Sequence, residues 1–401
     1  MRYVGIDISS EKHTVAIVDG ESAVIVKAKD FTEDHIGYAT LFEILGEDVE
    51  DHFVAMEATG HYWQNLFAAL VAKGFKVVLL NPIQTRRFAD SSLARTKTDK
   101  IDATTIARFA AEKKPTATIM PDEATLELRE LVRMRDRYVQ DFGDRVRQLH
   151  RIVDLGFPEL TRFIDDLGTA RATTILRHYP TAAEIAKQSP KKLAKLVYDG
   201  RHAIGETLAN TLVDAAKKSI GRHHGRAYKM QAVDLCEDID VLRARIKRLD
   251  KDVSDTLDKH DIGKLLMTID GIGENTAARI VGEVGDPSTF RDAGALAAYI
   301  GVVPALWQSG KRQSMRAGLA PIGHADLRAK LWMPVLSAIK RNPWLRAFYD
   351  RLIARGKLPK VAIVAAMRKL LAAIYSVAKN RRPFTPILAT TSAPTAVENS
   401  C

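Results

Sequence analysis

The segment Arg2-Tyr3-Val4-Gly5-Ile6-Asp7-Ile8-Ser9 carries the first secondary-structure signal of the N-terminal part of the chain. Its apolar run predicts a short buried strand, and one acid, Asp7, stands inside it. Apolar patterns after it predict two more strands, at 13–19 and 23–29. The chain therefore opens with three consecutive strands that can pair as a meander.

Helices and strands alternate after this meander. Their predicted ranges are a helix at 34–45, a strand at 53–58, a helix at 63–73, a strand at 76–81 and a helix at 99–112. Three strands followed by such an alternation is the order of an α/β domain with an RNase H-like mixed sheet. We assign this domain to residues 1–115.

The rest of the chain is predicted to be helical. A long helix is expected at 123–155, and apolar residues from Leu235 to Val253 repeat at spacings of four and three, as in a coiled coil. That seam is compatible with a helical hairpin inside one chain or with a coiled coil between chains. We divide this part into a helical linker or coiled-coil region at 122–262, a C-terminal domain at 263–384 and a disordered tail at 385–401.

Composition indicates a soluble chain with uneven charge. Its 401 residues are 46% hydrophobic and 27% charged, which excludes disorder for most of the length. No apolar run approaches about 18 residues, no signal peptide is recognisable, and two cysteines exclude a disulfide framework, so a cytoplasmic protein is expected. Residues 1–60 hold 4 basic and 13 acidic residues, whereas residues 301–384 hold 17 and 2. The second segment predicts a polyanionic partner, most often nucleic acid.

Four acids form the first candidate site. Asp7 and Glu57 end predicted neighbouring strands, and Asp99 and Asp102 lie on one face at the start of a helix. Converging carboxylates repel one another unless divalent cations neutralise them, and oxygen ligands suit Mg²⁺ or Mn²⁺. Two such ions could clamp a phosphodiester. Taken singly, Asp99 could instead cap its helix, and Glu57 could pair with His61.

A glycine turn forms the second candidate site. Within residues 265–280, Asp270-Gly271-Ile272-Gly273 separates two predicted helices, as in a helix-hairpin-helix. Gly271 and Gly273 would let backbone N–H groups approach a nucleic-acid phosphate. An ordinary helical hairpin with a glycine turn remains the alternative.

A basic segment forms the third candidate site: Gln308-Ser309-Gly310-Lys311-Arg312-Gln313-Ser314-Met315-Arg316. A serine here could attack a phosphate while Lys311, Arg312 and Arg316 neutralise the growing charge. Taken alone, a Ser-Gly pair in a loop is usually just a turn.

These motifs together resemble one family over residues 1–380, the DEDD insertion-sequence transposases of the Piv/MooV type, also called bridge-RNA-guided recombinases. Asp7, Glu57, Asp99 and Asp102 match the family's acidic tetrad. The segments that match the family's motifs in order and spacing are 96–103, 270–273, 298–304 and 308–311. Asp270 replaces a usual proline, and His324 replaces a usual asparagine.

The resemblance implies a RuvC-like nuclease domain and a helical transposase domain. It implies that Ser309 forms a covalent phosphoserine intermediate, and that the acids and this serine come from different subunits of a homo-oligomer, a dimer or tetramer. It also implies donor and target DNA as substrates, a structured guide RNA as partner, and Mg²⁺ or Mn²⁺ as cofactor. Gly271, Gly273, Lys311, Arg312, Arg316 and Arg328 are the residues expected to contact nucleic acid, in the nucleoid of a bacterial or archaeal cell.

Three other functions share parts of this pattern. A Holliday-junction resolvase would use the acids with metal-activated water and no serine, although such chains usually end near residue 180. An actin-like kinase or ATPase would need a phosphate-binding turn after Asp7, where this chain has Ser9-Ser10-Glu11-Lys12. A non-enzymatic RNA-binding protein would not need all four acids.

Overall fold

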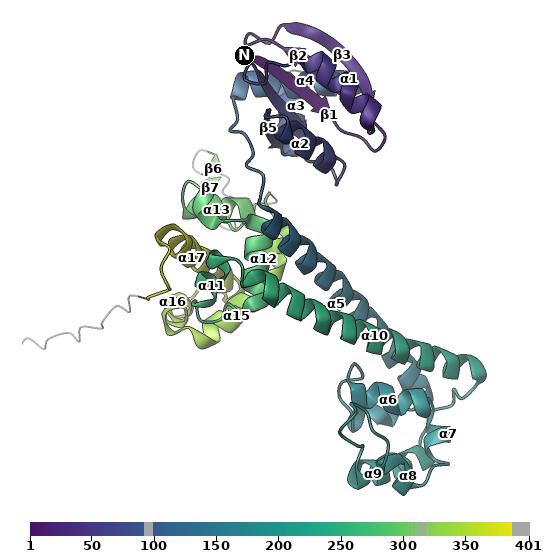
Figure 1. Ribbon diagram of the computed structural model, residues 1–401. Coiled ribbons are helices and arrows are strands. Elements are labelled where there is room, and N and C mark those ends of the chain that lie inside the picture. Colours follow the sequence, from purple (N-terminus) through teal and green to yellow (C-terminus); the bar gives the residue numbers. More distant parts are fainter. Residues whose placement is uncertain (92–98, 306–307, 310–311, 314–317, 321, 387–401) are drawn as a thin grey trace, which may run out of the picture. The chain divides into compact units, whose positions relative to one another are not determined.

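The chain divides into two compact units, residues 1–120 and 121–401. The computed structural model describes residues 1–91, 99–305, 308–309, 312–313, 318–320 and 322–386 (Figure 1). The predicted tail at 385–401 lies outside these residues apart from its first two positions.

A five-stranded mixed sheet forms the centre of the first unit. Its strands are β1 (Arg2–Asp7), β2 (Lys12–Val18), β3 (Val24–Thr32), β4 (His52–Glu57) and β5 (Lys76–Leu80). Their order across the sheet is β3-β2-β1-β4-β5. The first three strands pair antiparallel, whereas β1, β4 and β5 run parallel. The predicted mixed sheet is confirmed, with strand boundaries shifted by one to three residues.

Helices cover both faces of this sheet, because alternate residues of each strand point to opposite sides. Side chains such as Val4, Ile6 and Met56 pack with α1 (His35–Leu45) and α2 (Trp63–Ala72). On the other face, Tyr3 and Ala55 pack with α4 (Asp99–Lys113), which lies within one residue of its predicted range. A further helix, α3 (Pro82–Ser91), was not predicted.

Two long helices organise the second unit. α5 (Glu123–Gly156) and α10 (Arg226–Leu257) pack against each other within one chain (Figure 1). Ion pairs join them, with Arg135 Nε 2.6 Å from Asp250 Oδ1 and Arg145 Nε 2.8 Å from Asp238 Oδ2. The apolar seam of α10 is therefore used in an intramolecular hairpin, one of the two arrangements left open by its spacing.

Each end of this hairpin belongs to a different hydrophobic core. At one end, Leu149 and Val153 of α5 pack with a module of short helices. These are η1 (Pro158–Arg162), α6 (Ala170–His178), α7 (Ala182–Ile185), α8 (Pro190–Ala194) and α9 (Glu206–Lys217). We call residues 157–225 the tip module.

At the other end, Leu128 and Val253 join the core of a C-terminal bundle. Its elements are α11 (Asp261–Met267), α12 (Glu274–Val284), η2 (Pro287–Thr289), α13 (Ala293–Ile300), α14 (Ala325–Lys330), α15 (Trp332–Arg341), α16 (Pro343–Ala354) and α17 (Pro359–Asn380). Among described helices, α17 alone is long and apolar enough to cross a membrane. Its apolar residues, including Ile363, Leu370 and Ile374, instead form the centre of the bundle core.

Candidate active site

Asp7 and Glu57 lie side by side on the sheet. Each follows a directly paired position, because Ile6 of β1 pairs with Met56 of the parallel neighbour β4. Adjacent strands are about 4.8 Å apart, so the two acids stand at matched positions at the carboxyl ends of both strands. Side chains along a strand alternate between the two faces of the sheet. Tyr3 and Ala55 point to the face covered by α4, so Asp7 and Glu57 lie on that face too.

A glycine lets α4 reach this face. A Cβ built on Gly5 would stand 2.1 Å from the carbonyl oxygen of Ala103 and 2.4 Å from the amide nitrogen of Ala107. No side chain fits there, so the helix backbone rests directly on β1, two residues before Asp7. Ala103 directly follows Asp102, so this contact holds the first turns of α4 against the face that carries Asp7 and Glu57.

Thr85 of α3 holds the carboxylate of Glu57. Its hydroxyl donates to Glu57 Oε1 and, at 3.1 Å, to the carbonyl of Pro82. The side chain is only 3% exposed, which is unusual for a polar group unless it is hydrogen-bonded. Sequence reasoning missed this residue, and it paired Glu57 with His61 as the alternative to a metal role. The signal was present, because Asn81-Pro82 after a strand is a typical helix start.

Asp7 and Glu57 share one face of the sheet, but the described acids do not close into a metal site. Within the described side chains, no group of three or more His, Cys, Asp or Glu lies close enough to hold a metal ion. Asp99 begins α4, but its side chain lies outside the described residues. Asp7, Glu57 and Asp102 are all half-buried, so each remains accessible from solvent.

The predicted nucleophile lies on a β-hairpin in the second unit. Ser309 belongs to β6 (Gln308–Ser309), and its backbone pairs with Arg312 of β7 (Arg312–Gln313). The sides of this hairpin are joined near its base, where Ala305 N donates to the Gly318 carbonyl at 2.8 Å and Ala320 N to the Val303 carbonyl at 2.9 Å. The side chains of Ser309 and Arg312, and all of Lys311 and Arg316, lie outside the described residues.

Two glycines form the root of this serine hairpin. Gly301 and Gly323 have φ angles of +83° and +111°, and a Cβ on Gly323 would lie 2.5 Å from Gly301 Cα. The chain therefore leaves α13 and returns to α14 through a close backbone contact that only glycine allows. Arg328 Nη1 donates to the Gly301 carbonyl at 3.2 Å. This residue, expected to contact nucleic acid, thus also braces the hairpin root.

A buried ion cluster lies beside the root. Glu283 of α12 is 8% exposed and accepts two 2.8 Å hydrogen bonds from Arg133 of α5. His324, which caps α14, places Nε2 3.4 Å from the same carboxylate. Burial alone would raise the pKa of Glu283, but hydrogen bonds from His324 and Arg133 lower it to about 2. The cluster ties the hairpin root to the long helix.

The predicted glycine turn joins α11 to α12, but its two glycines differ. A Cβ on Gly271 would stand 2.4 Å from Ala338 Cα, so this glycine allows α15 to pack against the turn. A Cβ on Gly273 would meet nothing within 4 Å, and Gly273 is exposed before α12. Of the pair, Gly273 has the open surroundings that a bound phosphate requires.

Comparison with known proteins identifies the chain. A transposase model for DEDD enzymes of the IS110 type matches residues 4–158, and the model described as "Transposase IS116/IS110/IS902 family" matches residues 263–350. The chain belongs to the IS110/IS116 family of transposases. Members of this family cleave and rejoin DNA, so this transposase is an enzyme.

Relatives match along nearly the whole transposase. The 44.8 kDa protein of insertion element IS116 from Streptomyces clavuligerus is 27% identical over 390 residues, 96% of each chain. The pilin gene-inverting protein of Moraxella bovis is 25% identical over 386 residues, covering 95% of this chain and 97% of the relative. The 43.6 kDa protein of insertion element IS110 from Streptomyces coelicolor is 25% identical over 312 residues, 77% and 76% of the two chains.

A third family model indicates a helix-hairpin-helix in a part of the chain where the sequence analysis predicted only short helices. The model described as "SAM-like Helix-hairpin-helix tandem" matches residues 157–218, which make up most of the tip module. The glycine turn at 270–273, between α11 and α12, lies outside this match, and its contact with nucleic acid stays a prediction.

Proposed function

We propose that this transposase recombines insertion-sequence DNA with an RNase H-like acidic site and a serine nucleophile, directed by a structured RNA. The observation that carries the proposal is the position of Asp7 and Glu57, each directly after the paired residues Ile6 and Met56 of adjacent parallel strands, with α4 resting on Gly5 beside them. The strand order β3-β2-β1-β4-β5 supports the RNase H-like assignment.

The donor set fits a hard divalent cation. Asp7, Glu57, Asp99 and Asp102 supply only carboxylate oxygens, which suit Mg²⁺ or Mn²⁺. Two bound metal ions would polarise the scissile phosphate and neutralise charge on its oxygens. Thr85 positions Glu57 for this role, and the sheet register positions Asp7.

Ser309 is the proposed nucleophile. A bond forms between its Oγ and the scissile phosphorus, and the bond from phosphorus to the departing strand's oxygen breaks. The serine proton passes to that oxygen, directly or through water, so the strand leaves with a free hydroxyl. Lys311, Arg312 and Arg316 neutralise the charge that develops on the phosphate. Family resemblance adds that the acids and Ser309 come from different subunits of a dimer or tetramer.

Nucleic-acid contacts are proposed for two regions of the second unit. Residues 301–384 carry 17 basic and 2 acidic side chains, and the tip module matches a helix-hairpin-helix tandem. Both suit sequence-independent contact with phosphates. Sequence choice would then come from base pairing with the guide RNA, inside the bacterial or archaeal cytoplasm.

Replacing an acid tests the proposed metal site. We expect Asp7→Asn or Asp102→Asn to slow strand transfer at least about 100-fold, because a lost ligand weakens metal binding. Glu47→Gln, an exposed acid of the same unit, is the control and should keep its activity. Calorimetric titration with Mg²⁺ and circular dichroism separate lost binding from lost folding. Wild-type rates in Asp7→Asn would refute the site.

A further inference from the structure

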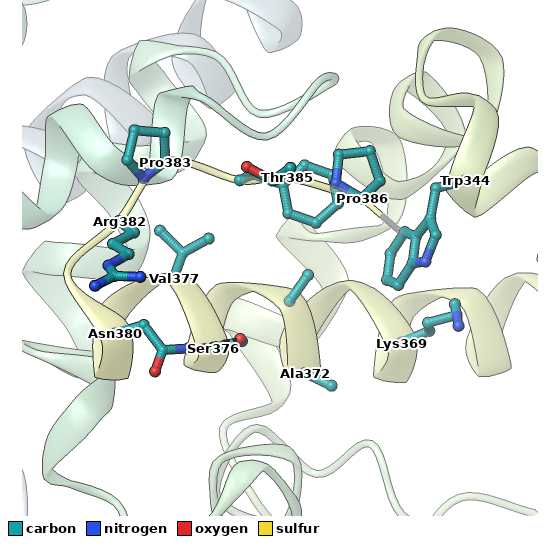
Figure 2. Close-up of a pocket in the computed structure, with 12 residues that line it drawn as sticks. Trp344, Lys369, Ala372, Ser376, Val377, Asn380, Arg382, Pro383, Thr385 and Pro386 are labelled. Carbon is teal, nitrogen blue, oxygen red and sulfur yellow. Dashed lines mark hydrogen bonds between the residues drawn. The ribbon is translucent and has the colours of Figure 1, made fainter. Parts of the chain in front are cut away.

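A cavity of about 870 Å³ lies on the C-terminal bundle. Its lining residues fall between Trp344 and Pro386, after the serine hairpin in the sequence. Figure 2 shows it between α17 and the chain segment that follows this helix, with the indole of Trp344 at one end. The polar, charged and aromatic side chains that line it are Trp344, Lys369, Ser376, Asn380, Arg382, Phe384 and Thr385. Its volume lies in the range of small-ligand sites.

The segment over the cavity is anchored at two points. The guanidinium of Arg381 pairs with Asp286, and the backbone N–H of Phe384 donates to Thr268 Oγ1 at 2.8 Å. The Phe384 ring then meets Trp344 edge to face, with ring centroids 5.4 Å apart. The cavity wall is therefore a built part of the bundle.

Lys369 is the unusual group in this wall. Its ammonium lies 4.3 Å from the ring centroid of Trp344 and 4.7 Å from that of Phe348. Arg351 lies over the same Phe348 ring at 5.5 Å. Burial and the neighbouring Arg351 lower the pKa of Lys369. Within the part of the chain that the structure describes, no carboxylate pairs with this lysine.

Two cations, Lys369 and Arg382, and two aromatic rings line this cavity, and together they suit an anionic, planar ligand. A nucleotide has both properties, because its phosphate pairs with cations and its base packs against rings. The base must be unpaired, since bases in a duplex already stack on each other. The chain's own residues 387–401 carry a single acid, Glu398, and offer no aromatic ring.

We propose that this cavity holds an unpaired nucleotide of single-stranded DNA, with its phosphate on Lys369 and its base against Trp344 and Phe384. The inference rests on the proposed function, in which cleaved or displaced DNA strands are present. It adds a contact that is separate from the acids and from Ser309.

Binding without divalent ions tests this cavity alone. The probe is a labelled 12-nucleotide oligothymidine, measured by fluorescence anisotropy on the full chain in EDTA. Lys369→Ala should weaken binding about tenfold. Lys360→Ala removes the same charge from an exposed position of α17 outside the cavity, and it should weaken binding less than about threefold. Equal effects of the two substitutions would overturn the proposal.

Further variants and a crosslinking experiment identify the ligand. Trp344→Phe should retain most of the binding that Trp344→Ala loses, because a ring remains. Bromodeoxyuridine in the oligonucleotide should crosslink to a wild-type peptide containing Trp344 or Phe384, and crosslinking only elsewhere would overturn the proposal. Tighter binding of duplex DNA or of an equal RNA strand at this cavity would also overturn it. Asp7→Asn should bind the oligonucleotide as the wild type does. The cavity can therefore be tested even if the proposed metal site is wrong.

Discussion

The acidic face of the first unit and the serine hairpin of the second are held by different kinds of contact. Asp7 and Glu57 are placed by sheet register and by a helix resting on Gly5, so apolar packing positions them. The serine hairpin is rooted in a glycine pair, backbone hydrogen bonds and the Glu283 cluster. A side chain that is too large for its site should therefore disturb the acidic face most. Removal of a charged side chain should disturb the serine hairpin most.

The largest effect is expected for Gly5→Ala. The new methyl group would stand 2.1 Å from the Ala103 carbonyl, so α4 must move away from β1. We expect the free energy of unfolding of the first unit to fall by about 3 kcal/mol, with loss of strand transfer. Gly20→Ala is the matched control, because nothing lies within 4 Å of a Cβ there. Urea denaturation measures both; equal stabilities would show that α4 does not rest on β1.

A smaller effect, confined to the second unit, is expected for Glu283→Gln. The amide cannot hold Arg133 and His324 as the carboxylate does, and we expect a loss of about 2 kcal/mol at pH 7. Hydrogen-bond donors lower the pKa of Glu283 from 4.5 to about 2. Its contribution is therefore present above pH 4.5 and lost as pH falls towards 2.

Urea denaturation between pH 7 and pH 3 checks this sign. The stability difference between wild type and Glu283→Gln should shrink below pH 4.5. A difference that grows on acidification would mean that the carboxylate is not stabilised by its cationic neighbours. Strand transfer should fall with stability, since the cluster supports the hairpin root.

The smallest effect is expected for Thr85→Val, which removes one hydroxyl from the acidic face at nearly constant volume. Glu57 then loses its hydrogen-bonded partner, and we expect strand transfer to slow about tenfold while stability changes little. Thr40→Val is the control, because the Thr40 hydroxyl bonds only within its own exposed helix turn. Unchanged rates in Thr85→Val would mean that Glu57 needs no positioning.

Much of the first unit could be predicted from its sequence. Alternating and continuous apolar runs are local signals, so the five strands and the helix from Asp99 were found within a few residues. The neighbouring positions of Asp7 and Glu57 followed from strand order. The role of Gly5 could not be predicted, because its partner Ala103 lies 98 positions away in sequence and the contact is visible only after folding.

Other features of the molecule escaped prediction for similar reasons. A glycine turn looks the same in sequence whether it approaches a phosphate or a helix, and Gly271 proved to approach Ala338. The cavity beside Trp344 is lined by residues of α16, of α17 and of the segment after α17, so no single sequence motif predicts it. Residues such as Thr85, which act by supporting another side chain, carry no chemical signature of their own.

A trapped covalent adduct is the most direct test of the serine chemistry. Suicide DNA, in which the departing strand is lost after cleavage, should leave a stable protein–DNA ester in the wild-type enzyme. We predict that Ser309→Ala abolishes this adduct and that Ser314→Ala, five residues further on, retains it. If Ser309→Ala recombines DNA at the wild-type rate, water is the nucleophile, and the enzyme cleaves as a resolvase does.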